Sequence, residues 1–474
     1  MKIVTTLCLL LGLVHYRYLS ATAYTGNRDS ITSPNVVLIV ADDLGWSDLG
    51  CYGNPYFESP HLDRLAQQGI RFDQAYAASH VCSPTRASIL TGRYPARVRL
   101  TNYLYGTKTV EDSPVLPAPF VRWLPFEEVT IAEELKEDGY VTGLVGKWHL
   151  GNNPASSVPD PQQQGFDVVH SFDYGLMRIA GEYEWVKARD STQTYDLPDL
   201  TEEITRNAVD FIHQNQDTAF FLMVTHYAVH LPLQGDSALV EKYRNKSNPR
   251  PNDYYHVYGA MIEQMDQSVG RIVNALEADG LADNTVIIFV SDNGGLAVAE
   301  AGTRPTVNTP LRAGKGTMYE GGIRVPMIAH WKGHFEGGLT NSSVISTVDL
   351  YPTLLELVRG KSQVSHTIDG QTRLTAFRNA STAPRGATYW HYPHFSNQGG
   401  YPRAAIRLDD YKLIRSLEDG STELYNLRED LGEKNDIGDQ HPQKVQQLND
   451  SLNQWFYQTQ ANMPIPAAKT RRDR

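Results

Sequence analysis

The sequence predicts an α/β protein with a large mixed, mostly parallel β-sheet flanked by helices and a smaller C-terminal α+β domain. Three observations predict this fold class. Apolar runs alternate with helical patterns from residue 34 to residue 358, which is typical of a layered α/β architecture. Three of these runs are continuously apolar, as strands buried on both faces are. Beyond residue 360 the alternation gives way to short segments typical of an antiparallel sheet.

Five strands are predicted for the large sheet. They cover residues 36–40, 141–145, 220–224, 286–290 and 325–329. The first, third and fourth are the continuous apolar runs, so we place them at the centre of the sheet. The second contains Thr142 and Gly143 and the fifth contains Pro326, which favours positions nearer the edges.

Capping residues and apolar periodicity predict the main helices. Ser59 is expected to cap one helix, a second is expected to begin at Thr130 and stop at Gly139, and Thr201 is expected to cap a third. A longer helix with an apolar face is expected to end before Gly280. In the C-terminal unit, a final helix is expected to begin at Pro442.

The C-terminal unit is also predicted to contain a β-hairpin. Residues 411–414 and 423–427 have the composition of strands, and Asp419-Gly420 between them is a typical hairpin turn. The change in pattern near residue 360 marks the expected domain boundary. We therefore predict a large domain at residues 24–365 and a C-terminal subdomain at residues 366–474.

The N-terminal segment has the features of a secretory signal peptide. Lys2 precedes an apolar run at residues 3–14, and residues 21–23 have the small-residue sequence of a cleavage site. We expect residues 1–23 to be removed and the mature protein to be secreted or periplasmic.

Composition excludes several classes of protein. The formal net charge is −11, with 43 Lys and Arg against 54 Asp and Glu and no long block of like charge, so nucleic-acid binding is not expected. Nothing after the signal peptide approaches the roughly 18 consecutive apolar residues of a membrane span. Three cysteines in 474 residues exclude a disulfide scaffold.

The strongest local motif is Cys82-Ser83-Pro84-Thr85-Arg86, followed by Ala-Ser-Ile-Leu-Thr-Gly-Arg at residues 87–93. It resembles the signature of the type I sulfatases, a family of the alkaline-phosphatase-like superfamily. In that family, a formylglycine-generating maturation enzyme reads the cysteine, proline and arginine and oxidises the cysteine to formylglycine (3-oxoalanine). A free cysteine on its own is most commonly a small buried residue, but the twelve-residue context of Cys82 favours the signature.

Polar pairs follow two of the predicted central strands. Asp42 and Asp43 follow residues 36–40, and Asp292 and Asn293 follow residues 286–290. Parallel strands end at one edge of a sheet, so these oxygen ligands are expected to converge on one hard cation, Ca²⁺ in preference to Mg²⁺. Each pair alone is also consistent with a turn or a helix cap. The resemblance implies a metal site formed by Asp42, Asp43, Cys82, Asp292 and Asn293.

Three further segments resemble sulfatase motifs. The first is Gly-Tyr-Val-Thr-Gly-Leu-Val-Gly-Lys-Trp-His at residues 139–149, whose functional positions in the family are Lys147 and His149. The others are residues 225–233, whose last histidine is His230, and residues 315–326, which begin at Lys315. The resemblance implies that His230 and Lys315 face the sulfate. A lone lysine or histidine is usually structural, but these blocks occur in the order of the family.

The resemblance implies hydrolysis of a sulfate ester with the hydrated formylglycine at position 82 as nucleophile. Arg86, Lys147 and Lys315 would neutralise the anionic sulfate, with Arg86 also orienting the formylglycine. His230 is the candidate general acid, with Lys315 as the competing candidate. His149 is the candidate base.

Secretion and the substrate range of the family favour a sulfated polysaccharide or oligosaccharide. Small aryl sulfates are an alternative, as is a phosphomonoester or phosphodiester hydrolase of the same superfamily or a sulfated-glycan-binding protein without turnover. A two-zinc phosphatase would require more histidine and aspartate ligands, and Asn293 after Asp292 favours a single hard cation. Tyr103, Tyr105 and Trp390 could line a sugar subsite or fill the core.

Overall fold

The structure is a computed structural model that describes residues 33–104, 106, 108–151, 160–171, 199–300, 304–379 and 384–467. The predicted signal peptide at residues 1–23 and the candidate subsite residue Tyr105 lie outside these ranges. Within the described residues, the helices are too short or too polar to cross a bilayer.

The large sheet contains eight strands within the described residues, in the order β10-β2-β9-β8-β1-β7-β5-β6. All neighbours are parallel except that β9 runs antiparallel to both β8 and β2. The predicted fold class is confirmed. The strands are β1 Asn35–Ala41, β2 Ile70–Phe72, β5 Val141–Gly146, β6 Val168–Ser171, β7 Phe220–Thr225, β8 Thr285–Ser291, β9 Met327–His330 and β10 Leu339–Asn341.

The three continuous apolar runs form the centre of the sheet, as predicted. β1 lies between β7 and β8, and every residue of these three strands is buried. β5 and β9 lie outside this centre. β9 begins at Met327, two residues later than predicted, because the prolyl residue at 326 has no N–H to donate to a neighbouring strand.

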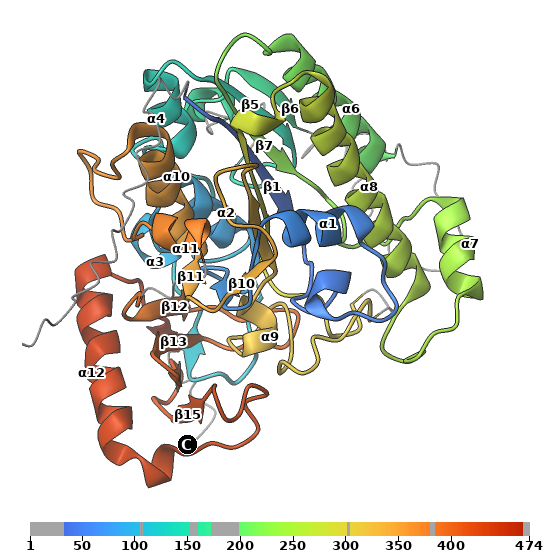
Figure 1. Ribbon diagram of the computed structural model, residues 1–474. Coiled ribbons are helices and arrows are strands. Elements are labelled where there is room, and N and C mark those ends of the chain that lie inside the picture. The colour runs from blue at the N-terminus through green and yellow to red at the C-terminus, as the bar shows by residue number, and fades with distance from the viewer. Residues whose placement is uncertain are drawn as a thin grey trace, which may run out of the picture. The chain divides into compact units, whose positions relative to one another are not determined.

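Helices cover both faces of the sheet (Figure 1). The apolar core on one face includes side chains of α1 Pro60–Gln68, α6 Leu200–Gln214 and α8 His256–Ala278. The core on the other face includes side chains of α2 Cys82–Thr91, α4 Ile131–Glu137 and α10 Leu350–Arg359. The sheet is therefore buried on both sides, which explains its continuous apolar strands.

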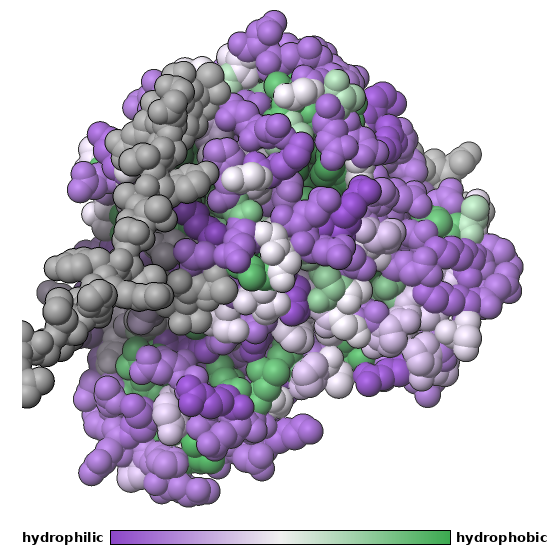
Figure 2. Space-filling model, in the orientation of Figure 1, coloured by the Kyte–Doolittle hydropathy of each residue, from purple (hydrophilic) through white to green (hydrophobic). Residues whose placement is uncertain are grey.

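Short elements complete the described fold. They are α3 Pro95–Val98, α7 Ser237–Asn245, α9 Glu320–Ile323, α11 Leu374–Arg378, β3 Ala75–Tyr76, β4 Val115–Leu116, β11 Ile345–Ser346 and β16 Ile465–Pro466. The molecular face in Figure 2 is mostly hydrophilic, with smaller apolar areas between the polar side chains. Such scattered apolar exposure is ordinary for a globular protein.

The starts of three helices differ in detail from the prediction. Thr130 is the N-cap of α4, which begins at Ile131, one residue later than predicted, and Thr130 forms a full capping box with Glu133. The cap of α6 is Asp199 and not Thr201, because the Asp199 side chain accepts from the amide of Glu202. Ser59 stands at the N-cap of α1, but its hydroxyl makes no capping bond there.

A carboxylate from a distant helix caps α1 instead. Asp266 in α8 accepts hydrogen bonds from the backbone amides of His61 (3.0 Å) and Leu62 (2.7 Å). We expect Asp266→Ala to lower the free energy of unfolding by about 1–3 kcal/mol, because it leaves two helix-terminal amides unsatisfied. Urea denaturation measures this loss. Asp266→Asn retains one acceptor oxygen and should be less destabilising; equal stability of all three proteins would contradict the cap.

The C-terminal residues form a separate antiparallel sheet. Its strand order is β12-β13-β14-β15, and the predicted hairpin is confirmed, with the Asp419-Gly420 turn between β14 and β15. The strands are β12 Thr388–Tyr392, β13 Arg403–Leu408, β14 Tyr411–Ser416 and β15 Thr422–Asn426, and the helix is α12 Pro442–Thr459. Apolar side chains of α12 pack against this sheet. The division into two domains at residue 365 stays a prediction.

Candidate active site

The carboxyl ends of two central strands define the candidate active site. β1 ends at Ala41 and β8 at Ser291, and these two residues are paired in register. The amide of Leu44 donates to Ser291 Oγ (3.1 Å), and Ser291 Oγ donates to the carbonyl oxygen of Asn293 (2.8 Å). The turns that follow the two strands are therefore fixed to each other at one edge of the sheet.

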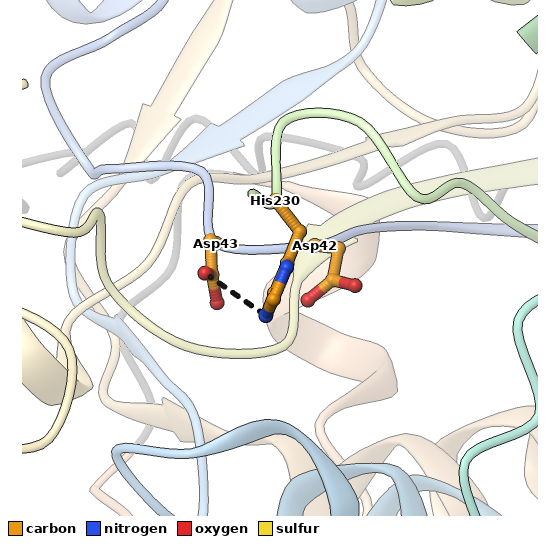
Figure 3. A group of neighbouring side chains, drawn as sticks. All are labelled: Asp42, Asp43 and His230. Carbon is orange, nitrogen blue, oxygen red and sulfur yellow. Dashed lines mark ion pairs between the residues drawn. The ribbon is translucent and has the colours of Figure 1, made fainter. Parts of the chain in front are cut away.

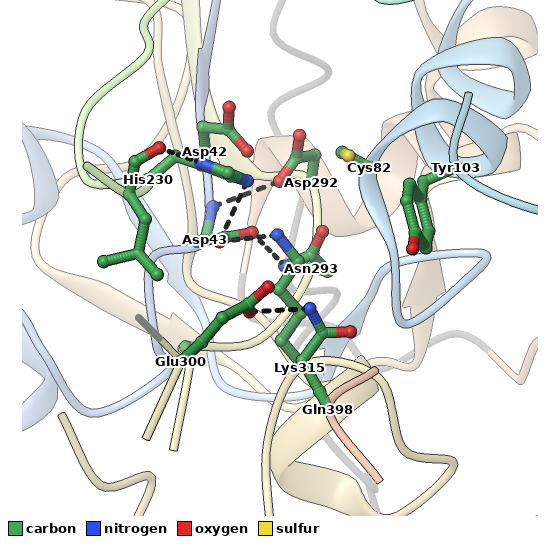
Figure 4. A network of polar contacts seen from close by, with 12 residues as sticks. Asp42, Asp43, Cys82, Tyr103, His230, Asp292, Asn293, Glu300, Lys315 and Gln398 are labelled. Carbon is green, nitrogen blue, oxygen red and sulfur yellow. Dashed lines mark hydrogen bonds and ion pairs between the residues drawn. The ribbon is translucent and has the colours of Figure 1, made fainter. Parts of the chain in front are cut away.

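Four oxygen-bearing side chains converge at this edge, as Figure 4 shows. The backbone amide of Asp43 donates to Asp292 Oδ1 (3.3 Å), and Asn293 Nδ2 donates to Asp43 Oδ1 (2.8 Å). Asp42, Asp292 and Asn293 are fully buried and Asp43 is 1% exposed. Asp43 has a φ of 61°, a left-handed conformation that aspartate tolerates better than most residues. The structure thus brings together both predicted pairs.

Three cationic side chains surround these carboxylates. Lys147, which follows β5, lies with Nζ 2.6 Å from Asp42 Oδ2, and Lys315 lies with Nζ 2.7 Å from Asp43 Oδ2. Arg86 Nε donates to Asp292 Oδ2 (2.8 Å), and its Nη1 donates to the carbonyl oxygen of Lys147 (3.0 Å). Three carboxylates therefore balance three cations before any substrate binds.

Burial and these charges shift the pKa values within the cluster. Burial alone would raise the pKa of Asp42, but Lys147, His230 and Arg86 hold it well below its usual range. Burial and the neighbouring Asp42 raise the pKa of Asp292. Burial opposes the ammonium form of Lys315, yet Asp43 raises the pKa of this lysine. Lys315 is consequently cationic at neutral pH.

Cys82 is the first residue of α2 and faces the cluster (Figure 4). Its Sγ lies 3.2 Å from His149 Nδ1, and its side chain is 2% exposed. Burial raises the pKa of the Cys82 thiol, with Lys147 and Lys315 opposing the shift. Burial, with Lys147 next, holds the pKa of His149 well below its usual value, so this imidazole is neutral at neutral pH.

His230 lies beside the carboxylates of Asp42 and Asp43. The sequence predicted that His230 faces the sulfate but did not predict this contact. One ligand atom from each of Asp42, Asp43 and His230 lies within 4.8 Å of the other two (Figure 3). His230 Nε2 lies 3.7 Å from Asp43 Oδ2. His230 Nδ1 lies 2.5 Å from the carbonyl oxygen of Leu231, so Nδ1 carries the proton and donates to this oxygen. The Nε2 atom is directed at the carboxylates.

The donor set fits a hard divalent cation. Asp42 Oδ1 and Asn293 Oδ1 are buried and have no hydrogen-bond partner among the described residues. A buried oxygen without a partner is costly unless a ligand satisfies it. Carboxylate and amide oxygens are the ligands that Ca²⁺ and Mg²⁺ prefer.

The predicted sugar-subsite candidates differ in their surroundings. Trp390 is 1% exposed, and its Nε1 donates to the carbonyl oxygen of Ala77 (2.8 Å), so it fills the core. Tyr103 is half-buried and lies beside Cys82 (Figure 4). Sequence reasoning missed Glu300 and Gln398 near the site, since no motif marks either residue.

Comparisons with known proteins agree with this geometry. The sulfatase family model matches residues 34–361, and the model for the C-terminal part of N-sulphoglucosamine sulphohydrolase matches residues 313–462. The N-acetylgalactosamine-6-sulfatase of Sus scrofa is 33% identical, over 79% of this chain and 72% of its own. Arylsulfatase A of Homo sapiens is 34% identical, over 80% of this chain and 74% of its own. The crystal structure of Ps i-CgsB in complex with k-i-k-neocarrahexaose is 29% identical with a TM-score of 0.74, covering 89% of this chain and 92% of that one.

Proposed function

Because the chain belongs to the sulfatase family of the alkaline-phosphatase-like superfamily, whose members hydrolyse sulfate esters, we propose that its substrate is a sulfated polysaccharide or oligosaccharide. The observation that carries the proposal is the placement of Cys82 beside three cationic side chains and four oxygen ligands at one edge of the sheet. The name of the porcine relative and the hexaose bound to Ps i-CgsB support a carbohydrate as the sulfate carrier.

The proposed reaction requires a formylglycine at residue 82 and a divalent cation beside it. Oxidation of Cys82 to formylglycine by a maturation enzyme, followed by hydration, supplies a hydroxyl group as the nucleophile. Asp42, Asp43, Asp292 and Asn293, with residue 82, would hold a divalent cation, Ca²⁺ or Mg²⁺, which would neutralise sulfate oxygens and make the hydroxyl more acidic.

The cationic side chains bind the sulfate and stabilise the charge that develops on it. Lys147 and Lys315 are each 6% exposed, so their charges act with little screening by water. Arg86 is held on one side by Asp292 and on the other by the backbone of Lys147, which lets it fix the start of α2 and thus the orientation of residue 82. Arg86 remains protonated throughout turnover.

Two histidines and a lysine are our candidates for moving protons. His149 Nδ1 is within hydrogen-bonding distance of residue 82, and a neutral imidazole there can accept a proton from that residue's second hydroxyl. His230 is our candidate for protonating the leaving alcohol, with Lys315 as the competitor. A general acid matters most for a poor leaving group, so loss of the acid should slow release of a sugar alcohol more than release of 4-nitrophenol.

Metal removal should inactivate the mature enzyme. Dialysis against EDTA is expected to lower turnover of 4-nitrophenyl sulfate by about 100-fold or more, because three buried carboxylates and a sulfate would then face only three cations. Adding Ca²⁺ or Mg²⁺ in excess should restore the rate, and the more effective ion identifies the cofactor. Full activity after removal, verified by elemental analysis, would contradict the metal site.

A substrate comparison tests the function itself. The mature enzyme should hydrolyse N-acetylgalactosamine 6-sulfate or related sugar sulfates and 4-nitrophenyl sulfate much faster than 4-nitrophenyl phosphate. A preference for the phosphate would instead indicate a phosphomonoester hydrolase. Binding of sulfated glycans without any turnover would indicate a binding protein.

A further inference from the structure

Two loops that are far apart in the sequence both contact the segment that carries Lys315. The amide of Lys315 donates to the carbonyl oxygen of Gly295 (3.1 Å). Gly316 has a φ of 84°, and a Cβ there would lie 2.5 Å from Ser396 Oγ and 2.6 Å from Gln398 Cβ. The loops at residues 295–300 and 396–400 therefore both pack against this short segment.

Glu300 connects the two loops beyond Lys315 (Figure 4). Its carboxylate accepts from Asn397 Nδ2 (2.6 Å) and Gln398 Nε2 (2.8 Å). Among the described residues it forms no ion pair, so two neutral amides hold an uncompensated negative charge. A carboxylate has about four lone-pair positions, which leaves it able to accept further hydrogen bonds.

Tyr103 extends this polar group toward residue 82. Its hydroxyl donates to Asn397 Oδ1 (3.2 Å). Its ring lies beside Cys82 in Figure 4. Hydrogen bonds thus connect Tyr103 through Asn397 to Glu300, and Glu300 to Gln398, in one set of polar side chains beside the Lys315 segment.

The chemistry of this set differs from that of the sulfate site. Sulfate binds where cations dominate, whereas a carboxylate, two amides and a phenol are the groups that hold neutral hydroxyls. An anionic group beside Glu300 would be repelled. We infer that Tyr103, Glu300, Asn397 and Gln398 form a subsite for uncharged hydroxyl groups of the sugar ring whose sulfate ester is cleaved. This inference rests on the proposed function and names the residues that select the sugar.

Variants of Glu300 and Gln398 test the subsite in the full-length mature enzyme. The sugar substrate is whichever of N-acetylgalactosamine 6-sulfate, galactose 6-sulfate and glucosamine 6-sulfate the wild-type enzyme hydrolyses fastest. Glu300→Gln and Gln398→Ala should each lower kcat/KM for the sugar substrate by about tenfold or more, mainly by raising KM. A loss of this size is expected when one hydrogen bond between the enzyme and a sugar hydroxyl is removed. The fall on 4-nitrophenyl sulfate should be far smaller. Glu429→Gln, at an exposed position, is the matched control.

The outcomes separate the subsite from the proposed function. An equal loss on the sugar and the aryl sulfate would show that the two loops only position Lys315, and no loss on either would also overturn the subsite. Turnover of the aryl sulfate but of no sugar sulfate by the wild-type enzyme would overturn the carbohydrate proposal together with the subsite. In a Cys82→Ala background, calorimetry should show weaker binding of the sugar sulfate but unchanged binding of inorganic sulfate after Glu300→Gln.

Discussion

Replacing Cys82 by alanine is expected to lower turnover of sulfate esters by roughly 10⁴-fold or more, since the variant has no side chain that can act as nucleophile. The fold should survive, because Cys82 is a small buried residue at the start of α2 and alanine is the best helix former. Steady-state kinetics measures the first effect and thermal unfolding the second. Residual turnover within tenfold of the wild-type enzyme would contradict the assignment of the nucleophile.

Cys82→Ser is the informative control for this experiment. It places a hydroxyl group near the position of the proposed nucleophile but provides no second hydroxyl on the same carbon. We expect this variant to be sulfated once on the new hydroxyl and then to stop, since the resulting ester has no internal route for eliminating sulfate. Sustained turnover by Cys82→Ser would show that the second hydroxyl is not needed.

The second large effect concerns stability and a buried ion cluster between the C-terminal sheet and α9. Lys412 in β14 is fully buried, with Nζ 3.0 Å from Glu320 Oε1 and 2.8 Å from Glu433 Oε1. Lys412→Met is expected to lower the free energy of unfolding by about 3–5 kcal/mol, because it leaves buried carboxylates without their shared cation. Equilibrium denaturation provides the measurement.

The pH dependence of this variant gives a second test. Burial raises the pKa of Glu433 to about 7, with Lys412 opposing the shift and Glu320 adding to it. A carboxyl with a raised folded-state pKa favours folding at low pH and loses that contribution as the pH rises toward the folded value. Lys412→Met should therefore be more destabilising at pH 8 than at pH 5. The double variant with Glu433→Gln should remove most of that difference, and a loss independent of pH would contradict the charge assignment.

The features predicted correctly from sequence are those set by local patterns. Three continuous apolar runs became β1, β7 and β8 at the centre of the sheet, since burial on both faces leaves a clear signature. The strands β2, β6 and β10 are three or four residues long and were not predicted, because such short segments carry little periodicity. The antiparallel direction of β9 depends on the path of the chain between strands, which local composition does not encode.

In the candidate active site, too, features set by local patterns were predicted and features set by tertiary packing were not. Asp42 and Asp292 were placed from the rule that parallel strands end together, and the structure brings them to one edge. The capping of α1 by Asp266, 204 residues from Leu62, and the contact of Glu300 with Gln398, 98 residues away, have no local signature. Such partners depend on tertiary packing, so only the folded structure identifies them.

The proposed mechanism depends most on the chemical state of residue 82. Mass spectrometry of the peptide that contains it, after expression with a formylglycine-generating enzyme, tests this state directly. We expect a peptide lighter by roughly 18 Da than the cysteine form, as oxidation of a thiol to an aldehyde requires. Specific activity should rise in proportion to the fraction of residue 82 that is converted. Full sulfatase activity in a preparation whose residue 82 is entirely unmodified cysteine would contradict the account.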